Sequence, residues 1–143
     1  METLKKSGFT LIELAVVIVI VAIVFLAIEI KWGTTPNLTA QAMQLADDIR
    51  YTQNLSMARN QRYQLVTSSS SYVIQNVSSG ATEYSVSLGS GITETSYTII
   101  FNTRGIPFDA SGNPLTSVAT ITLSASGQTS DVTIAPTTGR VTP

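Results

Sequence analysis

A run of apolar residues near the N-terminus limits the fold of this chain more than any other feature. Residues 14–28 read LAVVIVIVAIVFLAI and carry no charge. Together with residues 9–12, the run is about one bilayer thickness long as a helix, at ~1.5 Å per residue. One carboxylate, that of Glu13, interrupts it. The length and apolar character of the run predict a membrane helix over 9–32. Placing the Glu13 carboxylate in hydrocarbon would cost roughly 2.5–3.5 kcal/mol, so we also predict that Glu13 has a function.

The residues on either side of this segment predict its orientation. Lys5 and Lys6 precede it, which favours a cytoplasmic N-terminus, and Lys31 and Trp32 follow it, as expected at a headgroup layer. A secretory signal fits poorly, because residues 27–29 read AIE and make a poor cleavage site. A plain signal anchor remains an alternative, since one glutamate near an interface can be tolerated by snorkelling.

Residues 8–13 read GFTLIE, and with the following apolar helix they resemble the processing motif of type IV pilins and type II secretion pseudopilins. The resemblance implies that a prepilin peptidase cuts between Gly8 and Phe9 and that the new Phe9 amine is N-methylated. It divides the chain into a leader peptide (1–8), a transmembrane and filament-core helix (9–32) and an exported globular domain (33–143). The helix-kinking proline that many pilins carry near the end of this segment is missing here.

The same resemblance implies a role for Glu13 in subunit assembly. In the family, this glutamate is thought to pair with the Phe amine of a neighbouring subunit. Such a pair would remove the desolvation penalty of two buried charges and would fix the axial register between subunits. We therefore hypothesise that Glu13 selects register and recruitment more than it adds stability.

The composition argues against catalysis. The chain has no cysteine and no histidine, which excludes disulfides and the metal or nucleophile chemistry of those residues. Asp47 and Asp48 are adjacent, so on a helix they point about 100° apart and form no acid–base pair; a solvated helix face is expected. Residues 109–113 read DASGN, but the EF-hand pattern is absent and an ordinary turn is favoured. We therefore predict no enzymatic activity, no cofactor and no metal site.

The exported region predicts an α+β fold. After a break at 33–37, a helix is expected from about Thr39 to Asn60. Its apolar positions recur at helical spacing at Leu38, Ala42, Leu45, Ala46 and Ile49. A second apolar group, Tyr51, Leu55 and Ala58, lies on a different side; it either contacts neighbouring subunits or reflects a stripe that drifts around a buried helix.

Beyond Arg62 the apolar residues alternate as they do in strands. We expect a hairpin of 63–67 with 72–77, a pair of 83–88 with 97–102, a hairpin of 120–123 with 132–134, and a short last strand over 140–142. Between 83–88 and 97–102 we expect only a connection containing Gly89, Gly91 and Thr93. The predicted architecture is one long N-terminal helix, with a membrane-embedded half and an exported amphipathic half, packed on antiparallel sheet.

Several segments of the exported region resemble the GspH/FimT class of minor pseudopilins. They are residues 58–60, residues 100–107 (IFNTRGIP), the hairpin of 121–134, and residues 139–141 (GRV). Within them, we expect Gly105 to adopt a positive φ in a turn that Pro107 makes rigid.

Two functions follow from these resemblances. The first is a minor pilin or pseudopilin of an inner-membrane-based type IV pilus or type II secretion pseudopilus, which primes or caps the tip and has its C-terminal domain in the periplasm. Its expected partners are prepilin peptidase, other pilin or pseudopilin subunits and inner-membrane lipid. The sequence leaves the choice between secretion, pilus and DNA-uptake systems open.

The alternative is a DNA-binding minor pilin acting in natural transformation. Some relatives of the FimT kind bind DNA through a C-terminal Gly-Arg-x-Arg stretch, but residues 139–142 read GRVT and only Arg140 matches. Beyond Trp32 the chain has five arginines, no lysine and six acidic residues. Because non-specific DNA affinity depends on the number of phosphates neutralised, this balance predicts weak, salt-sensitive binding, and nucleic acid is not an expected partner.

Overall fold

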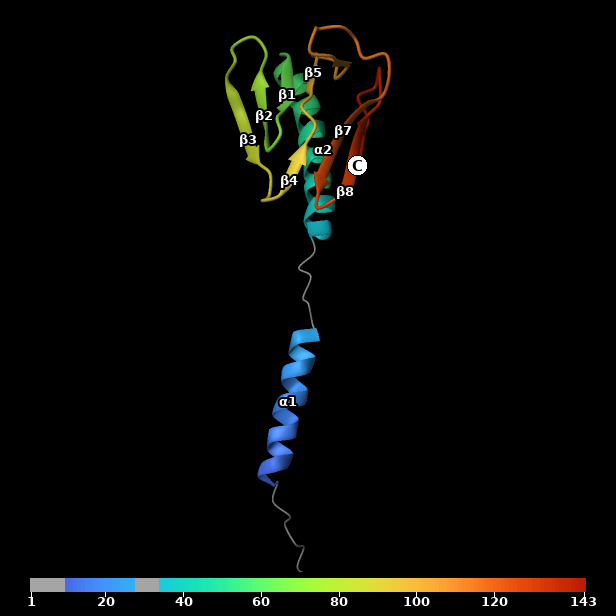
Figure 1. The fold of residues 1–143 in the computed structure, drawn as a ribbon. Helices are drawn as coiled ribbons and strands as arrows, with labels where there is room; N and C mark the ends of the chain where they lie inside the picture. Colours follow the sequence, from blue (N-terminus) through green and yellow to red (C-terminus); the bar gives the residue numbers. More distant parts are fainter. Residues whose placement is uncertain (1–9, 28–33) are drawn as a thin grey trace, which may run out of the picture. The chain divides into compact units, whose positions relative to one another are not determined.

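The computed structural model describes residues 10–27 and 34–143 (Figure 1). The chain divides into two units, Met1–Trp32 and Gly33–Pro143, and each is described by itself. Gly8, Phe9 and the end of the predicted membrane segment at 28–32 lie outside the described residues. Within the two described ranges, no helix combines the length and the hydropathy needed to cross a membrane.

The first unit contains a single described helix, α1 (Leu11–Ala27). Its sequence is apolar on every side, apart from Glu13. The described side chains from Thr10 to Ile23 are all exposed, Leu11 to 87% and Val17 to 47%. A helix that is hydrophobic all round requires lipid or other helices around it.

The second unit begins with α2 (Thr34–Arg59), which starts five residues earlier than predicted. The expected break at 33–37 is therefore wrong over Thr34–Asn37. Pro36 lies in the first turn of the helix, where the missing N–H leaves no hydrogen bond unmade and the fixed φ suits a helix. At the other end, Asn60 has a φ of 51°. Its N–H donates to the Met57 carbonyl and that of Gln61 to the Ser56 carbonyl, which is the Schellman pattern of helix termination.

The strands form two antiparallel sheets, so the predicted α+β fold with a helix packed on antiparallel sheet is confirmed. The first sheet has the order β3-β2-β1-β5-β6. Its strands are β1 (Tyr63–Thr67), β2 (Ser71–Asn76), β3 (Thr82–Ser87), β5 (Thr98–Phe101) and β6 (Pro107–Phe108). The hairpin of β1 with β2 is confirmed. The predicted pair of 83–88 with 97–102 is wrong, because β3 pairs with β2 at the edge and β5 pairs with β1 inside the sheet.

The second sheet has the order β4-β7-β8-β9. Its strands are β4 (Ile92–Glu94), β7 (Ala119–Ala125), β8 (Gln128–Ile134) and β9 (Val141–Thr142). The β7–β8 hairpin and the short last strand are confirmed. Ser126 and Gly127 both have positive φ, as a tight hairpin turn requires. The segment expected to be only a connection contains β4, which pairs with β7.

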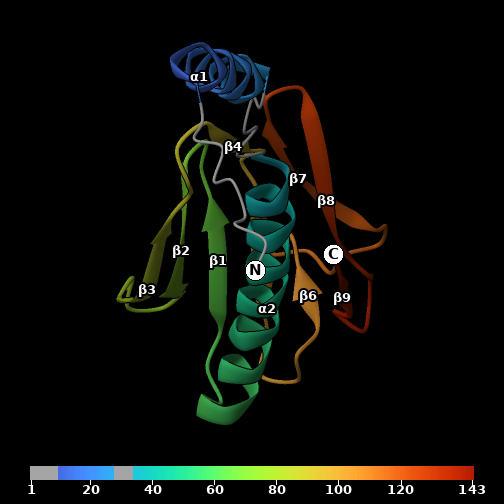
Figure 2. The same cartoon turned by 90° about the horizontal axis from the view of Figure 1, so that it is seen from below.

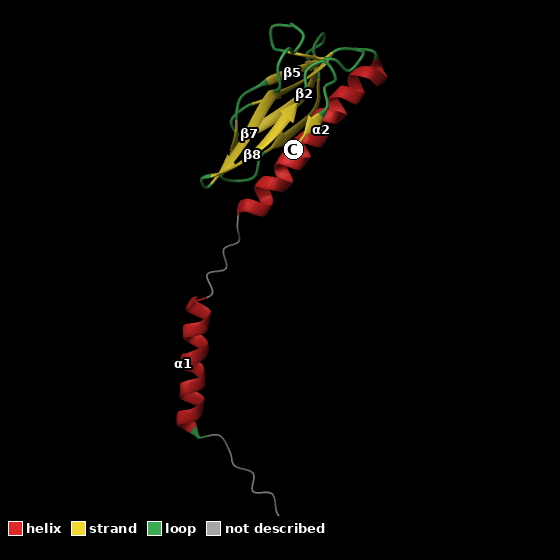
Figure 3. Ribbon diagram, turned by 90° about the vertical axis from the view of Figure 1, so that its right-hand side faces the viewer, coloured by secondary structure: helices red, strands yellow, loops and turns green. Residues whose placement is uncertain are grey.

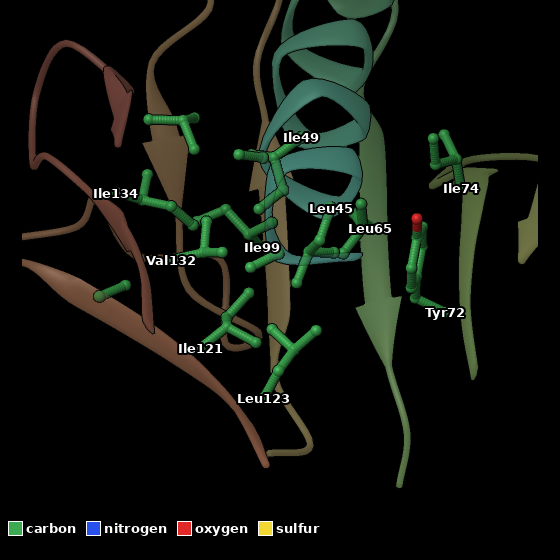
Figure 4. Packing of buried hydrophobic residues seen from close by; sticks show 14 of the residues in the cluster. Leu45, Ile49, Leu65, Tyr72, Ile74, Ile99, Ile121, Leu123, Val132 and Ile134 are labelled. Carbon is green, nitrogen blue, oxygen red and sulfur yellow. The ribbon is translucent and has the colours of Figure 1, made fainter. Parts of the chain in front are cut away.

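The core lies where α2 packs along both sheets (Figure 3). The predicted inner face of α2 is buried, and Leu45 and Ile49 meet residues of both sheets, including Leu65 and Ile121 (Figure 4). The second apolar group of α2 is divided: Leu55 is buried, whereas Tyr51 and Ala58 are exposed. Among the described residues, every buried hydrophobic side chain lies between Leu38 and Val141. The unit Gly33–Pro143 therefore has a core of its own.

Candidate functional site

The N-terminus of α1 brings Thr10 and Glu13 together. The Glu13 N–H donates to the Thr10 hydroxyl Oγ1 at 3.4 Å, and the Thr10 N–H donates to Glu13 Oε2 at 3.5 Å. This reciprocal arrangement is a capping box, and both bonds are longer than the usual 2.7–3.2 Å. The sequence analysis missed it, although the Thr-x-x-Glu signature at 10–13 could have revealed it. Among the described residues, the Glu13 carboxylate is thus held only by a weak local cap.

One side of α1 carries a shallow apolar groove. Ala15, Val16, Val19 and Ile20 line it, and its volume is about 230 Å³. The groove includes Ala15, whose side chain is short, so a side chain of another helix can approach the α1 backbone there. Close approach of this kind is what supplies packing energy between helices in lipid.

A second, larger cleft lies on the exported unit between α2 and the edge strand β3. Asp48 and Tyr51 of α2 and Glu83 and Tyr84 of β3 line it, and its volume is about 310 Å³. We call it the tyrosine cleft. Tyr51 and Tyr84 are 48% and 44% exposed, so both rings are available to a partner.

The environment of Asp48 differs from the solvated helix face that was expected. Asp47 is exposed, but Asp48 is half-buried and its Oδ2 accepts a hydrogen bond from the Tyr72 hydroxyl at 2.7 Å. Burial raises the pKa of Asp48, the Tyr72 bond lowers it and Asp47 raises it again. Burial, with the Asp48 bond, also raises the pKa of Tyr72. Among the described residues, Asp48 forms no ion pair.

The negative charge of Glu83 has more hydrogen-bonding partners than that of Asp48. The Arg59 guanidinium and the Tyr63 hydroxyl both donate to its Oε1. The guanidinium of Arg59 also lies 5.8 Å from the centre of the Tyr63 ring. These contacts fasten the end of α2 to β3.

Two turns of the segments that resemble the GspH/FimT class meet on the other side of α2. The Gln53 side chain donates from Nε2 to the Gly105 carbonyl at 2.8 Å and to the Thr138 carbonyl at 3.0 Å. Gly105 and Gly139 have φ of 75° and 66°, so the positive φ expected at Gly105 is confirmed. A Cβ at Gly139 would lie 2.6 Å from Gln53 Nε2 and 3.0 Å from the Gly105 carbonyl oxygen, so this contact requires glycine.

Each turn presents one arginine, Arg104 before Gly105 and Arg140 after Gly139. Both are exposed, and neither side chain has a hydrogen bond or ion pair within the described part of the chain. We call these two residues the arginine flank. The other three arginines of the exported unit are engaged: Arg50 bonds Asp47 and the Val141 carbonyl, Arg59 bonds Glu83, and Arg62 lies over the ring of Phe108.

The structure also bears on the 109–113 loop, on metal binding and on DNA binding. Asp109 Oδ1 accepts the backbone N–H groups of Ser111 and Asn113, at 2.9 and 2.8 Å, so this loop is the ordinary turn that was expected. Over residues 10–27 and 34–143, no group of three potential ligands could hold a metal ion. Nothing in the described part of the chain favours the DNA-binding alternative.

Comparison with known proteins decides the family. Residues 3–28 match the prokaryotic N-terminal methylation motif, and residues 41–138 match the family described as type II transport protein GspH. The chain belongs to the GspH family. The two matches together make this GspH-family chain a minor pilin or pseudopilin, and its family and fold are those of structural pilin subunits. No curated protein sequence shows significant similarity to it.

Solved structures agree with the fold. The type IV minor pilin FimU of Pseudomonas aeruginosa, crystallised in space group P21, is similar with a TM-score of 0.60 and 15% identity, over 76% of this chain and 90% of that one. The same protein crystallised in space group P65 is similar with a TM-score of 0.57 and 15% identity, over 73% of this chain and 90% of that one. The GspH family assembles with other pilin-like subunits. Its leader motif is typical of proteins anchored in the inner membrane with the globular domain in the periplasm.

Proposed function

We propose that this chain is processed between Gly8 and Phe9, is N-methylated at Phe9, and then joins an inner-membrane-based filament as a subunit that primes or caps its tip. The observation that carries the proposal is the apolar helix α1. Its described side chains are exposed all round, and Glu13 is the one acidic residue in the helix. Such a helix is suited to a bundle of like helices in which each surface is covered.

Glu13 is the residue that we assign to assembly. Cleavage would create a positive amine at Phe9, one helical turn before the Glu13 carboxylate. Within the part of the chain that the structure describes, this carboxylate is held only by the weak cap from Thr10, with distances of 3.4 and 3.5 Å. It is therefore available to exchange that cap for the amine of a neighbouring subunit, so that two charges that would otherwise be buried alone are paired with each other.

The first test measures leader cleavage and N-methylation directly. The mass of the protein isolated from cells should correspond to a chain that begins at Phe9 and carries one methyl group. A Gly8→Leu variant, which changes the residue before the cut, should keep residues 1–8. Recovery of unmodified, full-length wild-type protein would refute the proposed processing and would indicate a domain that is simply tethered to the membrane.

The second test measures incorporation of the chain into filaments. Glu13→Leu should leave membrane insertion intact and abolish incorporation into filaments. Glu29→Leu changes another carboxylate close to the apolar run and serves as the matched control, which should still incorporate. Normal incorporation of the Glu13 variant would refute the assembly role.

A further inference from the structure

We infer that β3 pairs with an extended segment of a different pilin-like subunit, and that this segment places a basic side chain in the tyrosine cleft. The inference rests on the proposed function and adds to it the kind of partner that the exported unit meets. A subunit that primes or caps a tip contacts subunits of other kinds, so the assigned partner is a different chain. Its basis is the open edge of β3 and the charge of the cleft beside it.

β3 is the longest strand at a sheet edge in the described part of the chain. Figure 2 shows it at the end of the first sheet, beyond β2 and β1. It has six residues, whereas the other edge strands, β6, β4 and β9, have two, three and two. Short edge strands offer little backbone to another chain, and long ones are commonly protected by lysine or proline. The sequence of β3, TEYSVS, contains neither, and its one charged residue, Glu83, is bonded by Arg59.

The backbone of β3 offers hydrogen-bonding groups to a further strand. The Leu88 N–H, directly after β3, donates to the Ser70 carbonyl at 2.9 Å, so this residue faces β2. Alternate residues of an antiparallel strand bond the same neighbour, and β3 pairs with β2 without interruption from Ser87 back to Tyr84. Tyr84 therefore also faces β2, whereas Ser85 and Ser87 direct their N–H and C=O groups away from the sheet. A peptide strand that bonds these groups would extend the sheet, which is the recognition mode called β-augmentation.

The same register brings an added strand next to the tyrosine cleft. Tyr84 pairs with Ile74, which is buried in the core, so the Tyr84 side chain lies on the α2 side of the sheet. A partner residue opposite Tyr84 would form a non-hydrogen-bonded pair with it, in which the Cα atoms are about 4.5 Å apart and the side chains lie close together. The partner's side chain would then enter the cleft beside Asp48 and Tyr51.

The cleft favours a basic side chain at that position. Asp48 is half-buried and has no ion pair among the described residues. The rings of Tyr51 and Tyr84 are exposed, and a cation over such a ring is attracted electrostatically. A second copy of β3 cannot supply this cation, because its sequence contains no lysine or arginine. Charge complementarity therefore indicates a partner segment with lysine or arginine opposite Tyr84.

Photo-cross-linking in cells can identify what occupies this edge. A benzophenone amino acid replaces Ser87 in the full-length chain, because the Ser87 side chain is exposed and the proposed contact uses only its backbone. We expect mass spectrometry to find a link to a different pilin-like subunit, with a lysine or arginine about three positions from the linked residue, as the spacing of Ser87 and Tyr84 requires. The same amino acid at Thr120, an exposed position of β7 in the other sheet, should not link to that segment.

A proline variant tests whether the contact is made by the backbone. Ser85→Pro removes the N–H that points away from β2, and proline is tolerated on an edge strand at such a position. It should lower the yield of the link several-fold, whereas Ser85→Ala, which removes only the hydroxyl, should not. Urea unfolding of the fragment 33–143 checks that both variants are folded. Equal yields from the two variants would overturn the strand pairing.

Charge variants test the cleft independently of the proline variant. Asp48→Asn can still accept the Tyr72 hydrogen bond, and it should lower the yield of the link several-fold. Asp47→Asn makes the same change of charge at the adjacent, exposed position and serves as the matched control, which should leave the yield unchanged. Equal yields from Asp48→Asn and Asp47→Asn would overturn the assignment of a basic side chain to the cleft.

The identity of the linked protein also decides. Leader removal and filament incorporation are measured on the same samples. Suppose that the chain is processed and incorporated, but position 87 gives no link, or links only to another copy of this chain or to a segment without a basic residue. The inference is then overturned and the proposed function stands. If the leader is uncut and the chain is absent from filaments, the proposed function is overturned, and the inference with it.

Discussion

The carboxylate of Glu94 should make the stability of the exported unit depend on pH in an unusual direction. Glu94 lies on β4, at the edge of the second sheet, and points inward beside Ile92. The residue is only 6% exposed, and neither carboxylate oxygen has a hydrogen-bond partner among the described residues. Burial raises its pKa from 4.5 to about 7.

The sign of the effect follows from linkage. Because the pKa is higher in the folded state, the native unit binds this proton more tightly than the unfolded chain does. Glu94 therefore favours folding fully below pH 4.5, and this contribution is lost as the pH rises through 7. The difference between 4.5 and about 7 corresponds to about 3 kcal/mol, which is a large share of the 5–15 kcal/mol typical of a domain.

Urea unfolding of the fragment 33–143 at several pH values measures this effect, since that unit has its own core. The informative variant is Glu94→Gln, which keeps the size of the side chain and cannot ionise. The free energy of unfolding of the wild type, minus that of the variant, should fall by about 2–3 kcal/mol between pH 5 and pH 8. Parallel curves for wild type and Glu94→Gln would refute the reasoning.

Three further predictions concern other contacts. Gly139→Ala should lower the free energy of unfolding by more than about 1 kcal/mol in urea titrations, and less so in a Gln53→Ala background, because the new Cβ clashes with the Gln53 amide. Thr10→Ala should keep normal filament incorporation in sheared fractions, because it removes only the weak cap of Glu13. The fragment 33–143 should not retard duplex DNA in a gel at 0.15 M salt, since Arg104 and Arg140 can neutralise only a few phosphates; tight retardation would revive the DNA-binding alternative.

The elements that the sequence predicted well are those with long, regular alternation. The β1–β2 and β7–β8 hairpins join such strands through short turns, so each strand has its partner close by in sequence. Pairing between distant strands could not be predicted in this way. Alternation shows which face of β3 or β5 is buried, but it does not identify the neighbouring strand. Their predicted mutual pairing was therefore wrong.

Two other errors arose from local signals that were outweighed by packing. Pro36 and Gly33 indicated a break, yet Pro36 is tolerated in the first turn of α2, which buries Leu38 immediately afterwards. The three residues of β4 lie between glycines and polar residues, and they are a strand because they pair with β7. The alternation in β4 places Glu94 on the same buried face as Ile92.

The tyrosine cleft could not have been predicted from the sequence, because its residues come from α2 and from an edge strand whose partner was mispredicted. The capping box at Thr10, by contrast, was visible in the sequence and was overlooked. The processing residues Gly8 and Phe9 are the opposite case. They are predicted from the motif alone and lie outside the described residues, so their role remains a prediction that mass measurement can decide.

The turns that resemble the GspH/FimT class acquire a common explanation in Gln53. Residues 100–107 and 139–141 are far apart in sequence, and each contains a glycine with positive φ next to an arginine. The structure brings Gly105 and Gly139 against one glutamine of α2, at a distance that no side chain other than hydrogen would allow at Gly139. The two glycines are thus required by a single packing contact. The same contact determines where Arg104 and Arg140 are displayed on the exported unit.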